Sequence, residues 1–129
     1  MSEQNVTLVR SLYDAFRRRD IEAVVGALDP EVEYVQSDEV PWGGHYRGHA
    51  GVVEFFQRLT STVDSRVEHE RFVDAGDHVV AVGHTQGKVL ATGKEFDVPA
   101  VHVWTLRNGK VVRFEAYIDH PRILAALRA

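Results

Sequence analysis

Two acid–base side chains stand next to each other near the end of this sequence. Asp119 and His120 lie in the segment YIDHPRI, between an apolar stretch and Pro121. A carboxylate beside an imidazole could orient the imidazole or pass a proton through it. The pair could instead cap a last helix, because proline fits the first helical position. The elements around the pair decide between these two interpretations.

Further polar candidates lie in the segment SDEVPWGGHYRGH, residues 37–49. Asp38 and Glu39 could supply a catalytic acid or base, since a carboxylate at the mouth of an apolar pocket could have a raised pKa. A solvated pair of loop residues is the simpler alternative. His45 and His49 are four residues apart, but no helix is predicted through them, which makes a metal site there a weak hypothesis.

Metal, thiol and cofactor chemistry have little support elsewhere. His69 and His84 could meet on the outer face of a sheet, yet two histidines without a carboxylate make a weak metal site. The chain contains no cysteine, which excludes disulfides, thiolate ligands and a cysteine nucleophile. No cofactor motif occurs, so we predict neither a metal nor an organic cofactor.

The composition is that of an ordinary globular domain. The 129 residues suit one domain spanning positions 1–129, with 44% hydrophobic and 26% charged residues. The formal net charge is -4 and the basic residues form no dense cluster, so we expect no nucleic-acid partner. Charges interrupt every apolar run, so we expect no membrane span and a cytoplasmic location.

Hydrophobic spacing predicts helices first and strands later. Helical periods run through residues 5–19, 21–28 and 50–63, and one early alternating strand covers residues 31–36. From residue 66 the pattern changes to four strands, separated by turns that each contain a glycine. The predicted fold class is α+β, with three N-terminal helices on one face of a curved, mostly antiparallel sheet.

Three segments together resemble the nuclear-transport-factor-2-like superfamily, and within it the SnoaL-like branch. They are LYDAFRRRDIEAVVGALDPEVEY, YRGHAGVVEFF and VHVWTLRNGKVVRFEAYID. The resemblance implies a cone-shaped fold, in which the helices and the curved sheet enclose a pocket. It also implies a homodimer formed through the outer sheet face. Function stays open, because relatives include isomerases, cyclases, epoxide hydrolases and non-catalytic modules.

The resemblance places His102 at a position that two enzyme groups use for chemistry. SnoaL-like polyketide cyclases carry a pocket histidine there, and ketosteroid isomerases carry an aspartic acid. The cyclases' acid–base aspartate falls on Ala116, which cannot move a proton. One aspartate of the limonene epoxide hydrolase triad also falls there, and the other two members fall near Gly83 and Thr85. An epoxide hydrolase of that design is therefore not expected.

The resemblance leaves the position of a general base open. Counting forward from the second helix places the isomerases' base at Gln36, and counting backward from Gly48 places it at Glu39. Asp38 and Glu39 both stay candidates. The isomerases' oxyanion tyrosine falls near Leu12 or Tyr13, and Tyr13 is the nearest hydroxyl.

Strand alternation then fixes which side chains face the pocket. Ala100, His102 and Trp104 share one face. A three-residue turn at RNG would pair His102 with Phe114, whereas a two-residue turn would pair it with Glu115 and reverse the face. The three-residue turn agrees with the resemblance. Gly83, Thr85 and Gly87 would then face inward and leave pocket volume, and Gly83 would lie opposite His102.

With this face, the pocket wall is apolar and suits a small hydrophobic molecule. Asp119 points outward on this assignment, which favours the helix cap over the active site. The expected lining residues are Trp42, Tyr46, Phe55, Trp104, Phe114, Ala116 and Ile118.

Two functions are compatible with these residues. The first is proton-transfer catalysis of an isomerase- or cyclase-like kind, with His102 as donor or base, Asp38 or Glu39 as its partner and Tyr13 as an auxiliary donor. The second is a non-catalytic module that binds a small ligand or mainly dimerises. Val101, Val103 and Tyr117 share the outer face, and this apolar patch predicts a homodimer.

Overall fold

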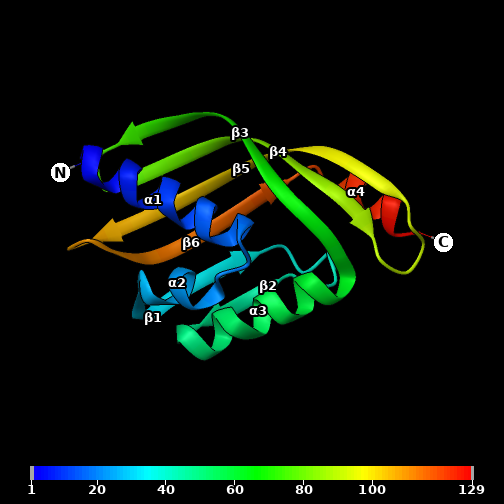
Figure 1. Ribbon diagram of the computed structural model, residues 1–129, viewed down its shortest axis with the longest axis horizontal. Coiled ribbons are helices and arrows are strands. Elements are labelled where there is room, and N and C mark those ends of the chain that lie inside the picture. The colour runs from blue at the N-terminus through cyan, green and yellow to red at the C-terminus, as the bar shows by residue number, and fades with distance from the viewer. Residues whose placement is uncertain (1, 129) are drawn as a thin grey trace.

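The computed structural model describes residues 2–128, over which the chain forms four helices and six strands (Figure 1). The helices are α1 (Ser2–Arg17), α2 (Ile21–Gly26), α3 (Gly48–Thr62) and α4 (His120–Leu127). The strands are β1 (Leu28–Gln36), β2 (Gly44–Arg47), β3 (Val63–Ala75), β4 (His78–Val89), β5 (Glu95–Arg107) and β6 (Lys110–Ile118).

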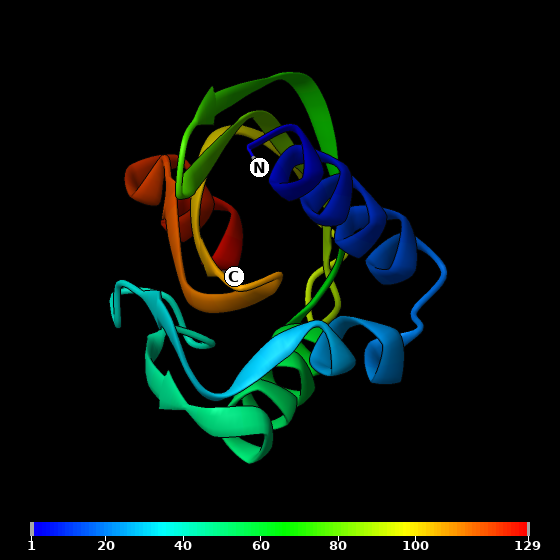
Figure 2. The ribbon, with the colours of Figure 1, turned by 90° about the vertical axis from the view of Figure 1, so that its left-hand side faces the viewer.

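The six strands form one strongly curved sheet in the order β2-β1-β6-β5-β4-β3. Only the β1–β6 pair is parallel, so the predicted α+β fold with a mostly antiparallel sheet is confirmed. Figure 2 shows the sheet curled around a central space, with α1 along its open side. Buried side chains from α1, α3 and the inner sheet face form the core in this space. None of the helices in residues 2–128 is both long and apolar enough to cross a membrane.

The second helix ends earlier than its pattern predicts, and β1 begins at Leu28. Pro30 therefore lies inside a strand. It is tolerated there because the β1–β6 register shifts between Leu28 and Glu33, which leaves Pro30 outside the regular ladder. Strand β2 was not predicted, since its four residues lie in a segment rich in glycine.

Two glycines let the sheet fold over along β4. A Cβ atom on Gly83 or Gly87 would overlap the backbone oxygen of Glu68 or Asp64 in β3. Strand β3 therefore crosses the inner side of β4 at a distance that only glycine permits. The expectation that these glycines leave pocket volume is wrong, because the β3 backbone fills that space.

The last hairpin combines a two-residue turn with a bulge. Asn108 and Gly109 both have positive φ, 54° and 75°, and Arg107 pairs with Lys110. The register then shifts between Thr105 and Leu106, so His102 lies opposite Ala116. The predicted pairing with Phe114 is wrong by two residues. Because side chains alternate with a period of two, the inner face is nevertheless the predicted one.

The predicted register between β4 and β5 is wrong in the same way. Ala81 lies opposite His102, and Gly83 lies opposite Ala100. The predicted Gly83–His102 pair is therefore wrong, again by an even number of residues. The side chains of Ala81 and Thr85 remain on the inner face.

Candidate functional site

A small cavity of about 70 Å³ lies on the inner face of the sheet. Its wall is mostly apolar and includes Ile123 of α4. The polar side chains that line it are Gln36, Ser65, Thr85 and His102. Five of the expected lining residues are in this wall, namely Trp42, Phe55, Phe114, Ala116 and Ile118.

The floor of the cavity is a row of three residues from neighbouring strands. Gln36 of β1 pairs with Ala116 of β6, which pairs with His102 of β5. Adjacent strands lie about 4.8 Å apart, so the ends of this row are separated by roughly 10 Å. The methyl group of Ala116 leaves the space between them free. Gln36 and His102 are the buried polar residues of the structure over residues 3–128, 7% and 8% exposed.

His102 is held by a chain of hydrogen bonds that begins at Trp104 on its own strand, β5, and passes through Tyr13 of α1. The Nε1 atom of Trp104 donates to the Tyr13 hydroxyl oxygen across 2.8 Å. That hydroxyl lies 2.6 Å from Nδ1 of His102. Since no other described residue offers an acceptor for the Tyr13 proton, the hydroxyl donates to Nδ1 and the ring carries its own proton on Nε2.

The imidazole is neutral and its second nitrogen stays available. Burial away from water, together with a smaller effect of the neighbouring His69, lowers the pKa of His102 from its ordinary 6.5 to about 3. Burial also raises the pKa of Tyr13 well above 10, so the hydroxyl keeps its proton. Among the described residues, the side-chain nitrogens that are both fully buried and without a hydrogen-bond partner belong to His69 and His120. Nε2 of His102 has no partner either but is not among them, so this atom is not fully enclosed and faces open space.

Tyr46 and Trp104 support the site from behind its wall. The Tyr46 hydroxyl donates to the backbone oxygens of Trp42 and Gly43, and its ring lies against Phe55. Trp104 positions Tyr13 through its indole N–H group. Neither residue lines the cavity itself.

The loop acids lie away from the cavity. Asp38 and Glu39 are both exposed, and neither lines the wall. Glu39 instead pairs with Nδ1 of His120 at 3.2 Å and accepts a hydrogen bond from Ser37. Of the three candidates for the isomerase-like base, the structure brings only Gln36 to the cavity, and an amide cannot serve as a base.

Asp119 caps α4, as predicted from the outward direction of its side chain. Its side chain accepts a hydrogen bond from the backbone N–H of Arg122 at 3.2 Å, and Pro121 lies in the first turn. His120 is the first residue of the helix. The pair thus fixes the start of the helix that supplies Ile123 to the cavity wall.

The predicted pairing of His69 and His84 on the outer face is wrong. His69 lies opposite Gly83, on the inner side, with its ring centroid 4.0 Å from that of Tyr13. His84 faces outward between Glu70 and Asp97, at 2.7 and 2.8 Å. The bulge after His69 shifts the register by one residue, which separates the two histidines onto opposite faces.

Several wall residues were not anticipated from the sequence. They are Phe16, Leu59, Val63, Ser65, Val67, Phe96 and Ile123. The alternation of Val63, Ser65 and Val67 was a usable signal, because it marks one face of β3.

The sequence matches the family of SnoaL-like domains over residues 9–114, most of its length. The chain belongs to the SnoaL-like domain family. This family is part of the nuclear-transport-factor-2-like superfamily, as the arrangement of the four helices and the mixed sheet also indicates. A comparison with curated proteins found no match.

Solved structures share both the fold and part of the sequence. A nuclear-transport-factor-2-like protein of unknown function from Burkholderia pseudomallei is 29% identical, with a TM-score of 0.92 and 98% of each chain covered. A second such protein, from Burkholderia thailandensis, is 31% identical, with a TM-score of 0.89 and coverage of 95% and 96%. TerC, co-crystallised with polyporic acid, is 30% identical, with a TM-score of 0.90 and coverage of 98% and 99%.

Proposed function

We propose that this SnoaL-like domain binds a small, mostly apolar molecule on the inner face of the sheet and donates a hydrogen bond to it from Nε2 of His102. The observation that carries the proposal is the 2.6 Å hydrogen bond between Tyr13 and Nδ1. It fixes one ring nitrogen as an acceptor and leaves the other as an N–H donor. A ligand oxygen, such as that of a ketone or a phenol, is the matching acceptor.

The electrostatics of the wall favour a donor over a base. A histidine with a pKa of about 3 is a poor proton acceptor near neutral pH. No carboxylate is among the residues that line the cavity, within the described part of the chain. The proton-transfer partner expected from Asp38 or Glu39 is therefore not supported by their positions.

The size of the cavity sets a condition on binding. Ligand pockets for small organic molecules usually enclose about 300–1,000 Å³, far more than the 70 Å³ present here. A ligand larger than a few atoms must displace part of the wall. The co-crystallisation of TerC with polyporic acid supports small-molecule binding by relatives of this chain.

Catalysis by the same donor is the second candidate. A hydrogen-bond donor that is already oriented in an apolar, water-poor site stabilises a developing negative charge on oxygen. His102 meets that description, since it is buried and held through Tyr13. Such a site would stabilise the negatively charged oxygen of the enolate form of a bound carbonyl compound.

Nitrogen NMR of the protein labelled on histidine tests the proposal with 2-acetylnaphthalene as the probe. We expect His102 in the Nε2–H form before addition, and a shift of that N–H signal when the ketone binds. His78, which hydrogen-bonds Thr105 on the surface, is the internal control. An Nδ1–H tautomer of His102, or a ketone that shifts His78 but not His102, would refute the proposed donor.

A further inference from the structure

The side chain of Gln36 lies in the cavity without a partner. It is 7% exposed, and within residues 2–128 neither its amide nitrogen nor its amide oxygen forms a hydrogen bond. These two atoms are not fully enclosed, since they are not among the buried atoms that lack a partner. They therefore face the cavity that Gln36 lines. Because buried polar groups are normally hydrogen-bonded, this amide points to a molecule held in the cavity.

The sheet fixes the position of Gln36. Its backbone pairs with Gly44 of β2 on one side and with Ala116 of β6 on the other. Alternation along β1 puts its side chain on the same inner face as that of Tyr34, whose ring stacks on the ring of Phe114 at 4.3 Å. The amide group itself is not bound by another described residue, so it can turn to present its N–H or its C=O group to a ligand.

Gln36 and His102 offer different chemistry at the two ends of the cavity floor. Nε2 of His102 only donates a hydrogen bond, because the ring is neutral and Nδ1 accepts from Tyr13. The amide of Gln36 both donates and accepts. A ketone oxygen matches the imidazole, whereas a hydroxyl group, which also donates and accepts, matches the amide.

The spacing of the two groups limits the ligand to about one ring. The ends of the floor are roughly 10 Å apart, and two hydrogen bonds of about 2.9 Å take up roughly 6 Å of that distance. The two ligand oxygens are then about 4 Å apart if the bonds lie in line, and about 6 Å apart if the bonds are bent. Substituents at non-adjacent positions of a six-membered ring span this distance. The volume of 70 Å³ also favours a single ring, since a cavity of about 150 Å³ holds benzene.

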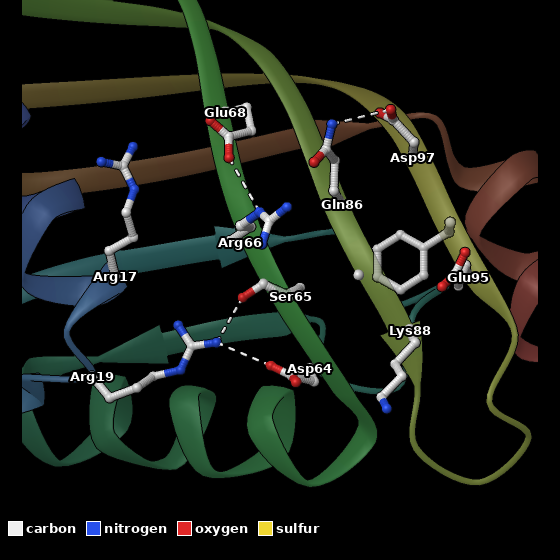
Figure 3. Close-up of a pocket in the computed structure, with 12 residues that line it drawn as sticks. Arg17, Arg19, Asp64, Ser65, Arg66, Glu68, Gln86, Lys88, Glu95 and Asp97 are labelled. Atoms are coloured by element: carbon white, nitrogen blue, oxygen red, sulfur yellow. Dashed lines mark hydrogen bonds and ion pairs between the residues drawn. The ribbon is translucent and has the colours of Figure 1, made fainter.

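The charged residues at this end of the sheet do not reach the cavity. Arg66 and Glu68 flank Val67 along β3, and Val67 lines the cavity. Alternation puts the two charged side chains on the other face of the sheet, where they pair at 3.1 Å (Figure 3). Among the described residues that line the cavity, none carries a charge at neutral pH. The wall therefore favours an uncharged ligand.

We infer that the cavity recognises two oxygens of one ligand, with His102 donating to a ketone oxygen and Gln36 binding a hydroxyl group on another side of the same ring. The inference rests on the proposed function and adds the ligand class, an uncharged hydroxy ketone built on one six-membered ring. Ala116 leaves room for that ring between the two polar side chains.

Three aromatic ketones of similar size test this inference on the parent protein. Acetophenone has the ketone alone, and meta-hydroxyacetophenone adds a hydroxyl group at the required distance. In ortho-hydroxyacetophenone the hydroxyl group binds the neighbouring ketone oxygen and cannot reach Gln36. Titrations followed by the nitrogen NMR signal of His102 should show the meta isomer bound about fivefold more tightly than acetophenone, as expected for one added hydrogen bond. The ortho isomer should gain nothing.

Gln36→Met tests the residue itself, because methionine keeps the length of the side chain and removes both polar atoms. The preference for the meta isomer over acetophenone should disappear in this variant. The matched control is Gln57→Met, the same substitution at an exposed position of α3. It should keep the fivefold preference.

The outcomes separate the inference from the proposed function. A preference that survives in Gln36→Met, is lost in Gln57→Met, or is equal for the ortho and meta isomers would overturn the inference. If acetophenone shifts the His102 signal but the meta hydroxyl group adds no affinity, the proposed function stands and the inference fails. If none of the three ketones shifts that signal, both fail.

Discussion

Tyr13 and His102, 89 positions apart in the sequence, are joined by a 2.6 Å hydrogen bond in the core. The bond links α1 to the inner face of β5, across the space that the sheet encloses. It also determines which imidazole nitrogen is protonated, and therefore what the cavity offers to a ligand. Under the proposed function, fold stability and ligand recognition depend on the same contact.

Tyr13→Phe should destabilise the protein by about 2 kcal/mol, because removal of the hydroxyl leaves both Nδ1 of His102 and the indole N–H of Trp104 without a partner. Urea unfolding at neutral pH measures the change. Ser11→Ala is the control, since the Ser11 hydroxyl binds the backbone oxygen of Leu8 on the surface of α1. Equal stability of Tyr13→Phe and the parent protein would show that the hydrogen bond contributes nothing.

Stability should fall as the pH is lowered, and His102 should account for part of the loss. Its pKa is about 3 in the folded protein and 6.5 when unperturbed, so between these values the unfolded chain binds a proton that the folded chain does not. At pH 4.5 this amounts to about 2–3 kcal/mol. The test compares urea unfolding of the parent and His102→Phe at pH 7 and 4.5. The parent should lose more stability than the variant, and parallel losses would contradict the assignment.

The inner face of the sheet could be predicted although two strand registers could not. The predicted pairs His102–Phe114 and Gly83–His102 were each displaced by two residues from the observed pairs. A displacement by an even number of residues keeps a side chain on the same face of the sheet. In the last hairpin, the two-residue turn would have reversed the face, but the bulge in β6 restored it. The sequence alone does not reveal this bulge, because the packing of the hairpin determines the turn and the bulge together.

The direction of the side chains in the loop after β1 could not be predicted, because strand alternation no longer applies there. Gln36 is the last residue of a regular strand, and its neighbours on that strand fix its direction. Asp38 and Glu39 follow the point where the strand ends, so no alternation rule applies to them. Their outward course depends on contacts made far away in sequence, such as that between Glu39 and His120.

Gly83→Ala should cost several kcal/mol, because its methyl group would overlap the Glu68 backbone oxygen and push β3 away from β4. Gly26→Ala, at the end of α2, is the matched control. No atom lies within 4 Å of its added Cβ, so we expect no loss of stability. Thermal melting of both variants provides the measurement. A Gly83→Ala protein that melts with the parent would show that the sheet is less tightly folded at β4.

Asp119→Ala should lower the stability by about 1 kcal/mol, the usual cost of a lost N-cap, whereas Asp119→Asn should be nearly neutral. Both variants should bind 2-acetylnaphthalene as the parent does, since the side chain lies outside the cavity. Melting curves and ligand titrations decide between a cap and a catalytic group. Loss of binding in Asp119→Asn with an unchanged melting temperature would place Asp119 in the site instead.

The outer face of the sheet should form the interface of a homodimer. Tyr117 is 55% exposed and lies directly opposite Val101, on the face that the helices do not cover. A two-fold interface would place both copies of this patch against each other, so one substitution acts twice. Tyr117→Lys should therefore give a monomer by light scattering at micromolar concentration, with an unchanged circular dichroism spectrum. Val53→Lys, at an exposed apolar position of α3, should leave the dimer intact. A parent protein that is monomeric under these conditions would rule out the interface.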